Sequence, residues 1–168
     1  MKFEKFSRIS RKYFGELLHD YGFDTERDKS PIFYRKNAED IYHIVSPKLG
    51  SRGVWYDINV FAHSPRISSD FYELFPKCVD IPSDLFSFLN PTTGVGFDQY
   101  MYRCRTEEGF IRNFEQLAKP AMIDFAIPYL DSIKTIESLV ATISPNLINS
   151  YQIPELKLKR KSIFGIKF

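Results

Sequence analysis

The chain has 168 residues, 43% of them hydrophobic and 16% aromatic, and a formal net charge of +2. This length predicts one domain, and the composition excludes a disordered chain and favours a core built largely from aromatic rings. No apolar run approaches the roughly 20 residues of a membrane span, and the N-terminus lacks the apolar segment of a signal peptide. With only two cysteines, Cys78 and Cys104, expected to be reduced thiols, we predict a cytoplasmic protein without a membrane partner.

The first predicted element is an amphipathic helix over Phe3–Tyr21. Apolar residues recur along it at helical spacing, while lysines and arginines occupy the other side. Gly22 follows as a natural helix stop, because glycine readily adopts the left-handed conformation in which many helices end. The charged segment Asp24–Lys29 is expected to connect this helix to a sheet.

Three strands are predicted next, at Ile32–Arg35, Ile41–Ser46 and Val54–Phe61. The segments between them have the length and the polar or glycine-rich composition of hairpin loops, so an antiparallel meander is the simplest topology. Both sides of the middle strand carry apolar residues. Its alternation therefore leaves open whether the side of His43 or that of Ile44 faces the core.

The strongest single signal is the strict alternation over Val54–His63. One side is uniformly apolar and is expected to face the core, whereas the other carries Trp55, Asp57, Asn59, Phe61 and His63. We interpret this second side as the candidate partner-binding surface, since a Trp among polar groups is typical of recognition patches. The alternative is a solvated or helix-covered sheet side whose polar groups bond one another.

The same side also has residues suited to general-base chemistry. Asp57 near a histidine would orient the imidazole, with His43 as a further candidate on the neighbouring strand, and Asn59 would polarise a carbonyl. No catalytic motif accompanies these residues, so we expect no catalytic site here. The three histidines and two cysteines show no metal-ligand spacing, and we expect neither a metal nor a cofactor.

The second half of the chain is less regular at first. Prolines interrupt Ser64–Gly96, which we expect to be a crossover without long elements. A fourth strand is predicted at Phe97–Cys104, and Thr106 is expected to cap the following helix. Pro120 should kink or divide that helix, with the chain then continuing helically, and a last helix is predicted over Ile133–Ile143.

The composition changes near the C-terminus. We divide the chain into a single α+β domain over residues 1–150 and a basic C-terminal strand or tail over residues 151–168. Lysines suit an exposed strand edge, and clustered basic side chains also suit an anionic partner such as nucleic acid. The candidate contacts to such a partner are Lys157, Lys159, Arg160 and Lys161.

The order of these features resembles DUF4304, a family of bacterial domains of unknown function. The matching pieces are the N-terminal helix ending in Gly22-Phe23, the segments Ile32–Arg35, Ile41–Ser46, Tyr56–Val60, Phe110–Leu117 and Ile127–Asp131, and the helix around Ser138-Leu139. The resemblance covers roughly Phe3–Ile143 and implies an α+β fold without an established activity. Relatives of this type accompany bacterial toxins, so the resemblance also implies an immunity-type role.

The sequence thus predicts an α+β fold, with an antiparallel sheet of about four or five strands and helices packed on one face. Our first functional hypothesis is a non-enzymatic bacterial protein-binding protein, an immunity protein that neutralises a cognate toxin by direct binding. The positive net charge disfavours a basic nuclease toxin as its partner. The alternatives are a nucleic-acid-associated protein using the basic C-terminal segment, and a small hydrolase with His43 or His63 as base.

Overall fold

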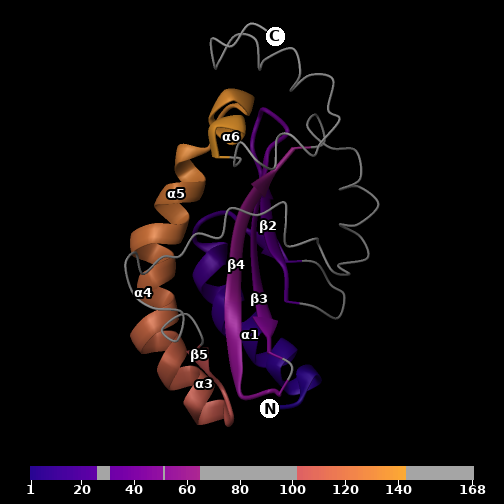
Figure 1. Ribbon diagram of the computed structural model, residues 1–168, viewed down its shortest axis with the longest axis vertical. Helices are drawn as coiled ribbons and strands as arrows, with labels where there is room; N and C mark the ends of the chain where they lie inside the picture. Colours follow the sequence, from indigo (N-terminus) through magenta and orange to yellow (C-terminus); the bar gives the residue numbers. More distant parts are fainter. Residues whose placement is uncertain (26–30, 51, 65–101, 143–168) are drawn as a thin grey trace, which may run out of the picture.

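The structure is a computed structural model that describes residues 1–25, 31–50, 52–64 and 102–142 (Figure 1). A five-stranded antiparallel sheet and a set of helices make up this part of the chain, which confirms the predicted α+β class. The predicted crossover, apart from Ser64, and the basic tail at residues 151–168 lie outside the described residues. Within the described ranges, no helix is long and apolar enough to cross a membrane.

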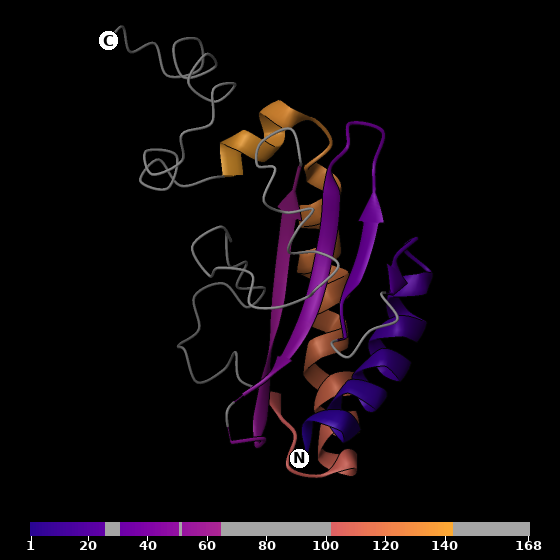
Figure 2. The same cartoon turned by 90° about the vertical axis from the view of Figure 1, so that its right-hand side faces the viewer.

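The five strands follow one another in chain order across the sheet, and each neighbouring pair is antiparallel. They are β1 (Asp24–Thr25), β2 (Phe33–Lys36), β3 (Tyr42–Leu49), β4 (Trp55–His63) and β5 (Tyr102–Arg103). The predicted meander of β2, β3 and β4 is confirmed, and Figure 2 shows the three strands side by side. The short strand β1 lies in a segment that the sequence predicted to be a connection, because two residues give no readable alternation. Of the predicted fourth strand, residues 97–101 lie outside the described part.

The first helix, α1 (Phe3–His19), confirms the amphipathic prediction and ends two residues early. Gly22 has a φ of +76°, and beyond it the Phe23 N–H donates to the Leu18 carbonyl at 3.1 Å. The positive φ that glycine tolerates therefore turns the chain out of the helix toward the sheet, as expected.

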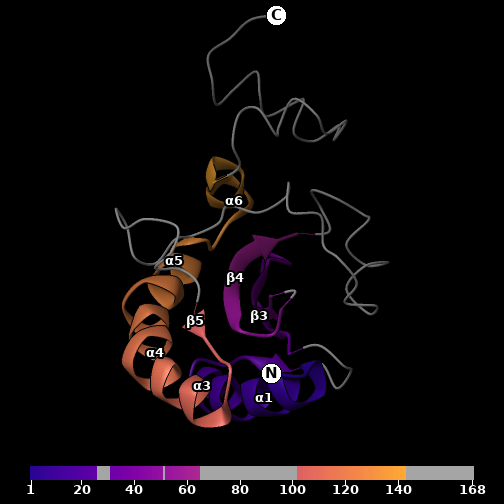
Figure 3. The same ribbon diagram turned by 60° about the horizontal axis from the view of Figure 1, so that its bottom comes forward.

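A long helical column covers the same side of the sheet as α1 (Figure 3). It consists of α3 (Glu107–Asn113), η3 (Phe114–Ala118), α4 (Lys119–Ala121), η4 (Met122–Ala126) and α5 (Ile127–Ser132), and a short connection leads to α6 (Ile136–Thr142). Thr106 caps the column as predicted, with its Oγ1 accepting from the Gly109 N–H at 3.0 Å. The last helix begins three residues later than predicted, because Ile133 lies in the connection.

Pro120 does not divide the column; a widened π-helical turn precedes it instead. A proline has no N–H and its ring crowds the carbonyl four residues earlier, so ordinary helical bonding fails there. The preceding Lys119 N–H bonds the carbonyl of Phe114, five residues back. Pro128 repeats the arrangement, with the Ile127 N–H bonding Met122. The helix thus continues past both prolines by admitting one extra residue before each.

The two π-turns bring residues eight positions apart onto the same side of the column. Two turns of an α-helix hold about 7.2 residues, and one extra residue raises this to about eight. Burial follows this period: Phe114 and Met122 are buried, Ala118 and Ala126 are fully buried, and Leu117 and Phe125 are 52% and 45% exposed.

The core between the column, α1 and the sheet is built from stacked and edge-on rings. Phe14 of α1 lies at its centre, with ring centroids 4.9 Å from Phe114 and 6.2 Å from Phe33. Tyr56 of β4 stacks on Phe110 at 5.0 Å, and both rings are fully buried. Much of the aromatic-rich composition is therefore used in the core between the sheet and the helices.

Candidate functional site

Strand β4 places the predicted partner-binding residues together on one face. Tyr56 and Val60 point into the helix-covered core, so the alternate residues lie on the side away from the helices. The β3–β4 register brings further β3 side chains onto that side. We call this surface the polar sheet face: Trp55, Asp57, Asn59, Phe61 and His63 of β4, with Tyr42, Ile44, Ser46 and Lys48 of β3.

The polar sheet face has an apolar centre. Phe61 and Ile44 are paired across the strands, and with Ile32 they form a small cluster whose members are almost completely buried. The four predicted contact residues, Trp55, Asp57, Asn59 and His63, are only half-buried around it. The face therefore combines a water-excluding centre with half-buried polar residues around it.

Asp57 is the most perturbed charge on this face. Burial raises the pKa of its carboxyl to about 6, and Lys48, its cross-strand partner in the register, opposes this shift. A raised pKa means that the carboxylate is poorly hydrated where it lies. Such a group gains more than an ordinary surface carboxylate when a second cation reaches it.

Trp55 occupies a position that depends on the turn before it. A Cβ atom added to Gly50 would lie 2.5 Å from the nearest atom of the Trp55 indole, so the ring lies directly against the glycine. The turn is closed by the Gly50 N–H, which donates to the Trp55 carbonyl at 2.9 Å, and by the Gly53 N–H, which donates to Gly50 at 2.8 Å. A side chain at position 50 would displace the indole.

His43 does not join this constellation, which corrects the expectation that it lies beside Asp57 and His63. In the register His43 faces Ala62, and Tyr42 faces His63, so the two histidines point to opposite sides of the sheet. The sequence could not predict which side of β3 His43 occupies, because both sides carry apolar residues. The side of Ile44 forms a small cluster of its own. His43 is therefore not part of the group of candidate residues around Asp57 and His63.

His43 is instead a buried, bonded histidine. Its Nδ1 accepts from Arg35 Nε at 3.2 Å, so Nε2 carries the hydrogen that is donated to the Ile133 carbonyl at 2.8 Å. Burial lowers the pKa of His43, while the bond to Ile133 raises it, Arg35 lowers it and Asp131 raises it. The neutral ring has no lone pair left with which to take a proton from a substrate.

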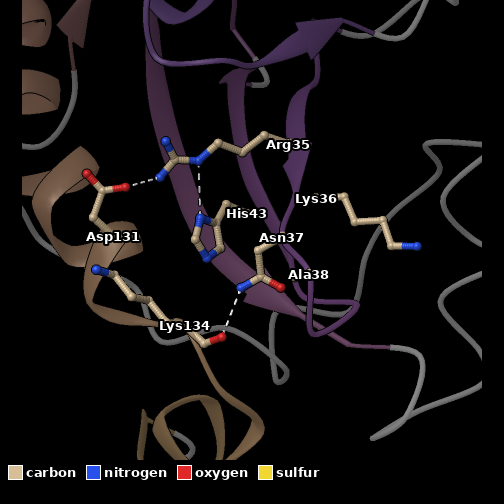
Figure 4. Close-up of a pocket in the computed structure, with 7 residues that line it drawn as sticks. All are labelled: Arg35, Lys36, Asn37, Ala38, His43, Asp131 and Lys134. Carbon is tan, nitrogen blue, oxygen red and sulfur yellow. Dashed lines mark hydrogen bonds and ion pairs between the residues drawn. The ribbon is translucent and has the colours of Figure 1, made fainter.

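His43 also lines a pocket that sequence analysis missed. The pocket lies where the β2–β3 hairpin meets the connection from α5 to α6 (Figure 4). Its volume is about 430 Å³, and we call it the hairpin pocket. It is lined by Arg35, Lys36, Asn37, Ala38, His43, Asp131 and Lys134.

Arg35 organises the hairpin pocket. One terminal nitrogen donates to Asp131, the other donates to the Tyr21 carbonyl at 2.9 Å, and the guanidinium lies 4.7 Å from the centre of the Phe23 ring. The sequence did contain a signal for the role of Arg35. Arg35 lies two residues after the core residue Phe33, so its charge is on the core side of β2. Its partner Asp131 lies 96 residues away, and no local pattern connects the two.

Asn37 holds the hairpin turn and the opposite wall together. Its Oδ1 accepts from the backbone N–H groups of Glu39 and Ile41, and its Nδ2 donates to the Lys134 carbonyl at 3.1 Å. The bonds to Glu39 and Ile41 lie within the hairpin turn, whereas the bond to Lys134 joins the turn to a residue 97 positions away. The hairpin pocket is thus a fixed junction between sheet and helices.

No protein-family model, curated protein or solved structure matches this chain in the comparisons with known proteins. The resemblance to the DUF4304 family accordingly stays a prediction of the sequence. Across residues 1–25, 31–50, 52–64 and 102–142, no group of three His, Cys, Asp or Glu side chains is placed to hold a metal ion. The two surfaces that remain to be assigned are the polar sheet face and the hairpin pocket.

Proposed function

We propose that this chain is a non-enzymatic protein-binding protein that contacts its partner through the polar sheet face. The observation that carries the proposal is the side-by-side placement of half-buried Trp55, Asp57 and Asn59 around an apolar centre. The apolar centre is already buried in the free chain, so a partner would contact the half-buried residues around it. Trp residues are common among the strongest contacts of protein interfaces.

The chemistry of the described residues favours binding over catalysis. A histidine acts as a general base through a ring-nitrogen lone pair directed at a substrate, and both ring nitrogens of His43 are already bonded. His63 lies on the other side of the sheet, where it cannot act together with His43. A hydrolase with His43 as its base is therefore the weaker proposal, and one with His63 as base would have to act without His43.

We further propose that the partner presents a Lys or Arg side chain to Trp55 and Asp57. These two residues are neighbours on one face, and together they offer an aromatic ring and a poorly hydrated carboxylate to a single cation. Given the resemblance to DUF4304, the partner class that we propose is a cognate toxin, which this chain neutralises by direct binding as an immunity protein.

The test is affinity capture from the native host lysate, followed by purification of the captured protein and calorimetric titration. We expect one protein to be retained by the wild type and by Leu117→Ala, which alters an exposed apolar residue on the helical column. Trp55→Ala and Asp57→Asn should each weaken its binding at least tenfold. Retention of nucleic acid alone, released by salt, would support the alternative function; equal losses for Leu117→Ala and Trp55→Ala would place the interface elsewhere.

A second pair of variants moves the indole without removing it. Gly50→Ala places a Cβ where the Trp55 ring lies, so we expect at least fivefold weaker binding with Trp55 still present. Gly15→Ala in α1 is the matched control, since its added Cβ would make an ordinary 3.6 Å contact with Phe33 of β2. If Gly50→Ala binds like Gly15→Ala, the position of Trp55 does not matter and the proposed interface fails.

A further inference from the structure

The hairpin pocket carries an excess of positive charge once its internal pairs are counted. Three cationic side chains line it, but Lys36 forms an ion pair with Asp40 and points away from the other lining side chains (Figure 4). Arg35 is paired with Asp131. Lys134 is left over, and its ammonium has no carboxylate within ion-pair distance among the described residues.

Lys134 is exposed, yet its backbone is fixed at the rim of the pocket. The Asn37 side chain holds its carbonyl at 3.1 Å, and the neighbouring Ile133 carbonyl is held by His43 at 2.8 Å. Two consecutive peptide groups are therefore tied to the sheet. The lysine stem starts from a defined place although its ammonium is not paired, which reduces the disorder that a ligand would have to remove.

Arg35 supplies further donors at the same place. A guanidinium has five N–H groups, and its bonds to His43, Tyr21 and Asp131 use three of them. Contact with the Phe23 ring and the low exposure of the side chain hold it in position. Two N–H groups on Arg35 thus have no acceptor among the described residues. They lie beside a cationic neighbour, in a pocket whose volume of about 430 Å³ suits a small ligand.

We propose that the hairpin pocket binds a small oxyanion, a carboxylate or a phosphate group, between the Lys134 ammonium and the remaining N–H groups of Arg35. Both anion types present oxygens that accept charge-assisted hydrogen bonds from these donors. The Asp131 carboxylate is half-exposed and already bonds Arg35, so it competes with the incoming anion. This site is on the opposite side of the sheet from the proposed protein interface and does not depend on it.

The competition gives two variants with opposite expected effects. Asp131→Asn removes the competing charge and should tighten anion binding at least threefold. Lys134→Ala removes the unpaired cation and should weaken binding at least fivefold. Lys119→Ala is the matched control, because it also removes one lysine, which pairs with Glu115 on the helical column away from the pocket lining.

The measurement is a titration of the full chain followed by ¹H–¹⁵N NMR, with inorganic phosphate in one arm and acetate in the other, at constant ionic strength. Saturable shifts of the Arg35 Nε–H and the Asn37 side-chain amide signals are expected, and the arm that saturates identifies the anion type. Unsaturable shifts in both arms, or equal weakening by Lys134→Ala and Lys119→Ala, would overturn the proposal. If thermal unfolding shows that Asp131→Asn is not folded, the comparison of the two lysine variants still decides.

Discussion

Asp57 carries a charge that its surroundings disfavour. Burial raises the pKa of its carboxyl to about 6 from an ordinary 3.8, so the folded chain keeps this proton over a pH range in which the unfolded chain has released it. The folded state therefore loses stability as the pH rises from 3.8 to about 6, and the loss is complete above that window. At neutral pH the Asp57 carboxylate is a destabilising group that a cationic partner would relieve.

Asp57→Asn should consequently stabilise the free protein at neutral pH. After allowance for solvent screening of a half-exposed group, we expect a gain of about 1 kcal/mol in the free energy of unfolding at pH 7.5. Almost no gain is expected at pH 3.5, where Asp57 is protonated in the folded state and mostly protonated in the unfolded state. Urea denaturation at the two pH values measures this difference, and Asp124→Asn on the exposed side of the column serves as the control. A gain in stability of equal size at both pH values would contradict the raised pKa of Asp57.

In the helical column, the two prolines produce an eight-residue repeat of buried and exposed positions. The pairs Ala118/Ala126 and Leu117/Phe125 keep the same environments only because each π-turn adds one residue to the helix. The buried alanines let the column approach the core closely, whereas the residues that precede them, Leu117 and Phe125, are exposed. Substitutions that change side-chain size should therefore have very different effects on stability at adjacent positions of one turn.

Ala126→Leu should lower the free energy of unfolding by about 1–3 kcal/mol, because the added atoms enter a fully packed position. Phe125→Ala, next to it in the chain, should change stability by under about 0.5 kcal/mol, since its side chain is half-exposed. Chemical denaturation of both variants tests the repeat. A larger loss of stability for Phe125→Ala than for Ala126→Leu would mean that Phe125, and not Ala126, faces the core.

Elements with a strong local period were predictable, and the features set by distant contacts were not. The alternation of β4 identified both of its faces, and the position of Thr106 identified the start of the column. The side of His43 was undetermined, because a second apolar cluster lies on the other face of β3. The hairpin pocket was missed because Arg35 and Asp131 meet only after the column has docked on the sheet.

At the scale of the whole molecule, one ring joins the three parts of the fold. Phe14 of α1 contacts Phe33 of β2, Tyr56 of β4 and Phe114 of the column, and it is fully buried. The sheet, the first helix and the column therefore share a single core. Removing this ring should destabilise all three parts together.

Phe14→Ala should cost about 3–5 kcal/mol, a large fraction of the stability of a domain of this size. Phe3→Ala, at the exposed start of the same helix, should cost under about 0.5 kcal/mol. Circular dichroism and fluorescence should report one coincident transition in urea for the wild type. If Phe14→Ala is unfolded in buffer, Phe14→Leu measures the smaller loss, and a loss no larger than that of Phe3→Ala would contradict the shared core.

The division of this core along the chain has a consequence for synthesis. Phe6, Phe14 and Tyr56 belong to the first 64 residues, but Phe110, which covers Tyr56, is made much later. At ~5–20 residues per second, the roughly 46 residues from Ser64 to Phe110 take about 2–9 seconds to translate. During that interval the nascent helix and meander expose an aromatic surface on the ribosome, where a chaperone that binds apolar segments would find its site before the column closes over it.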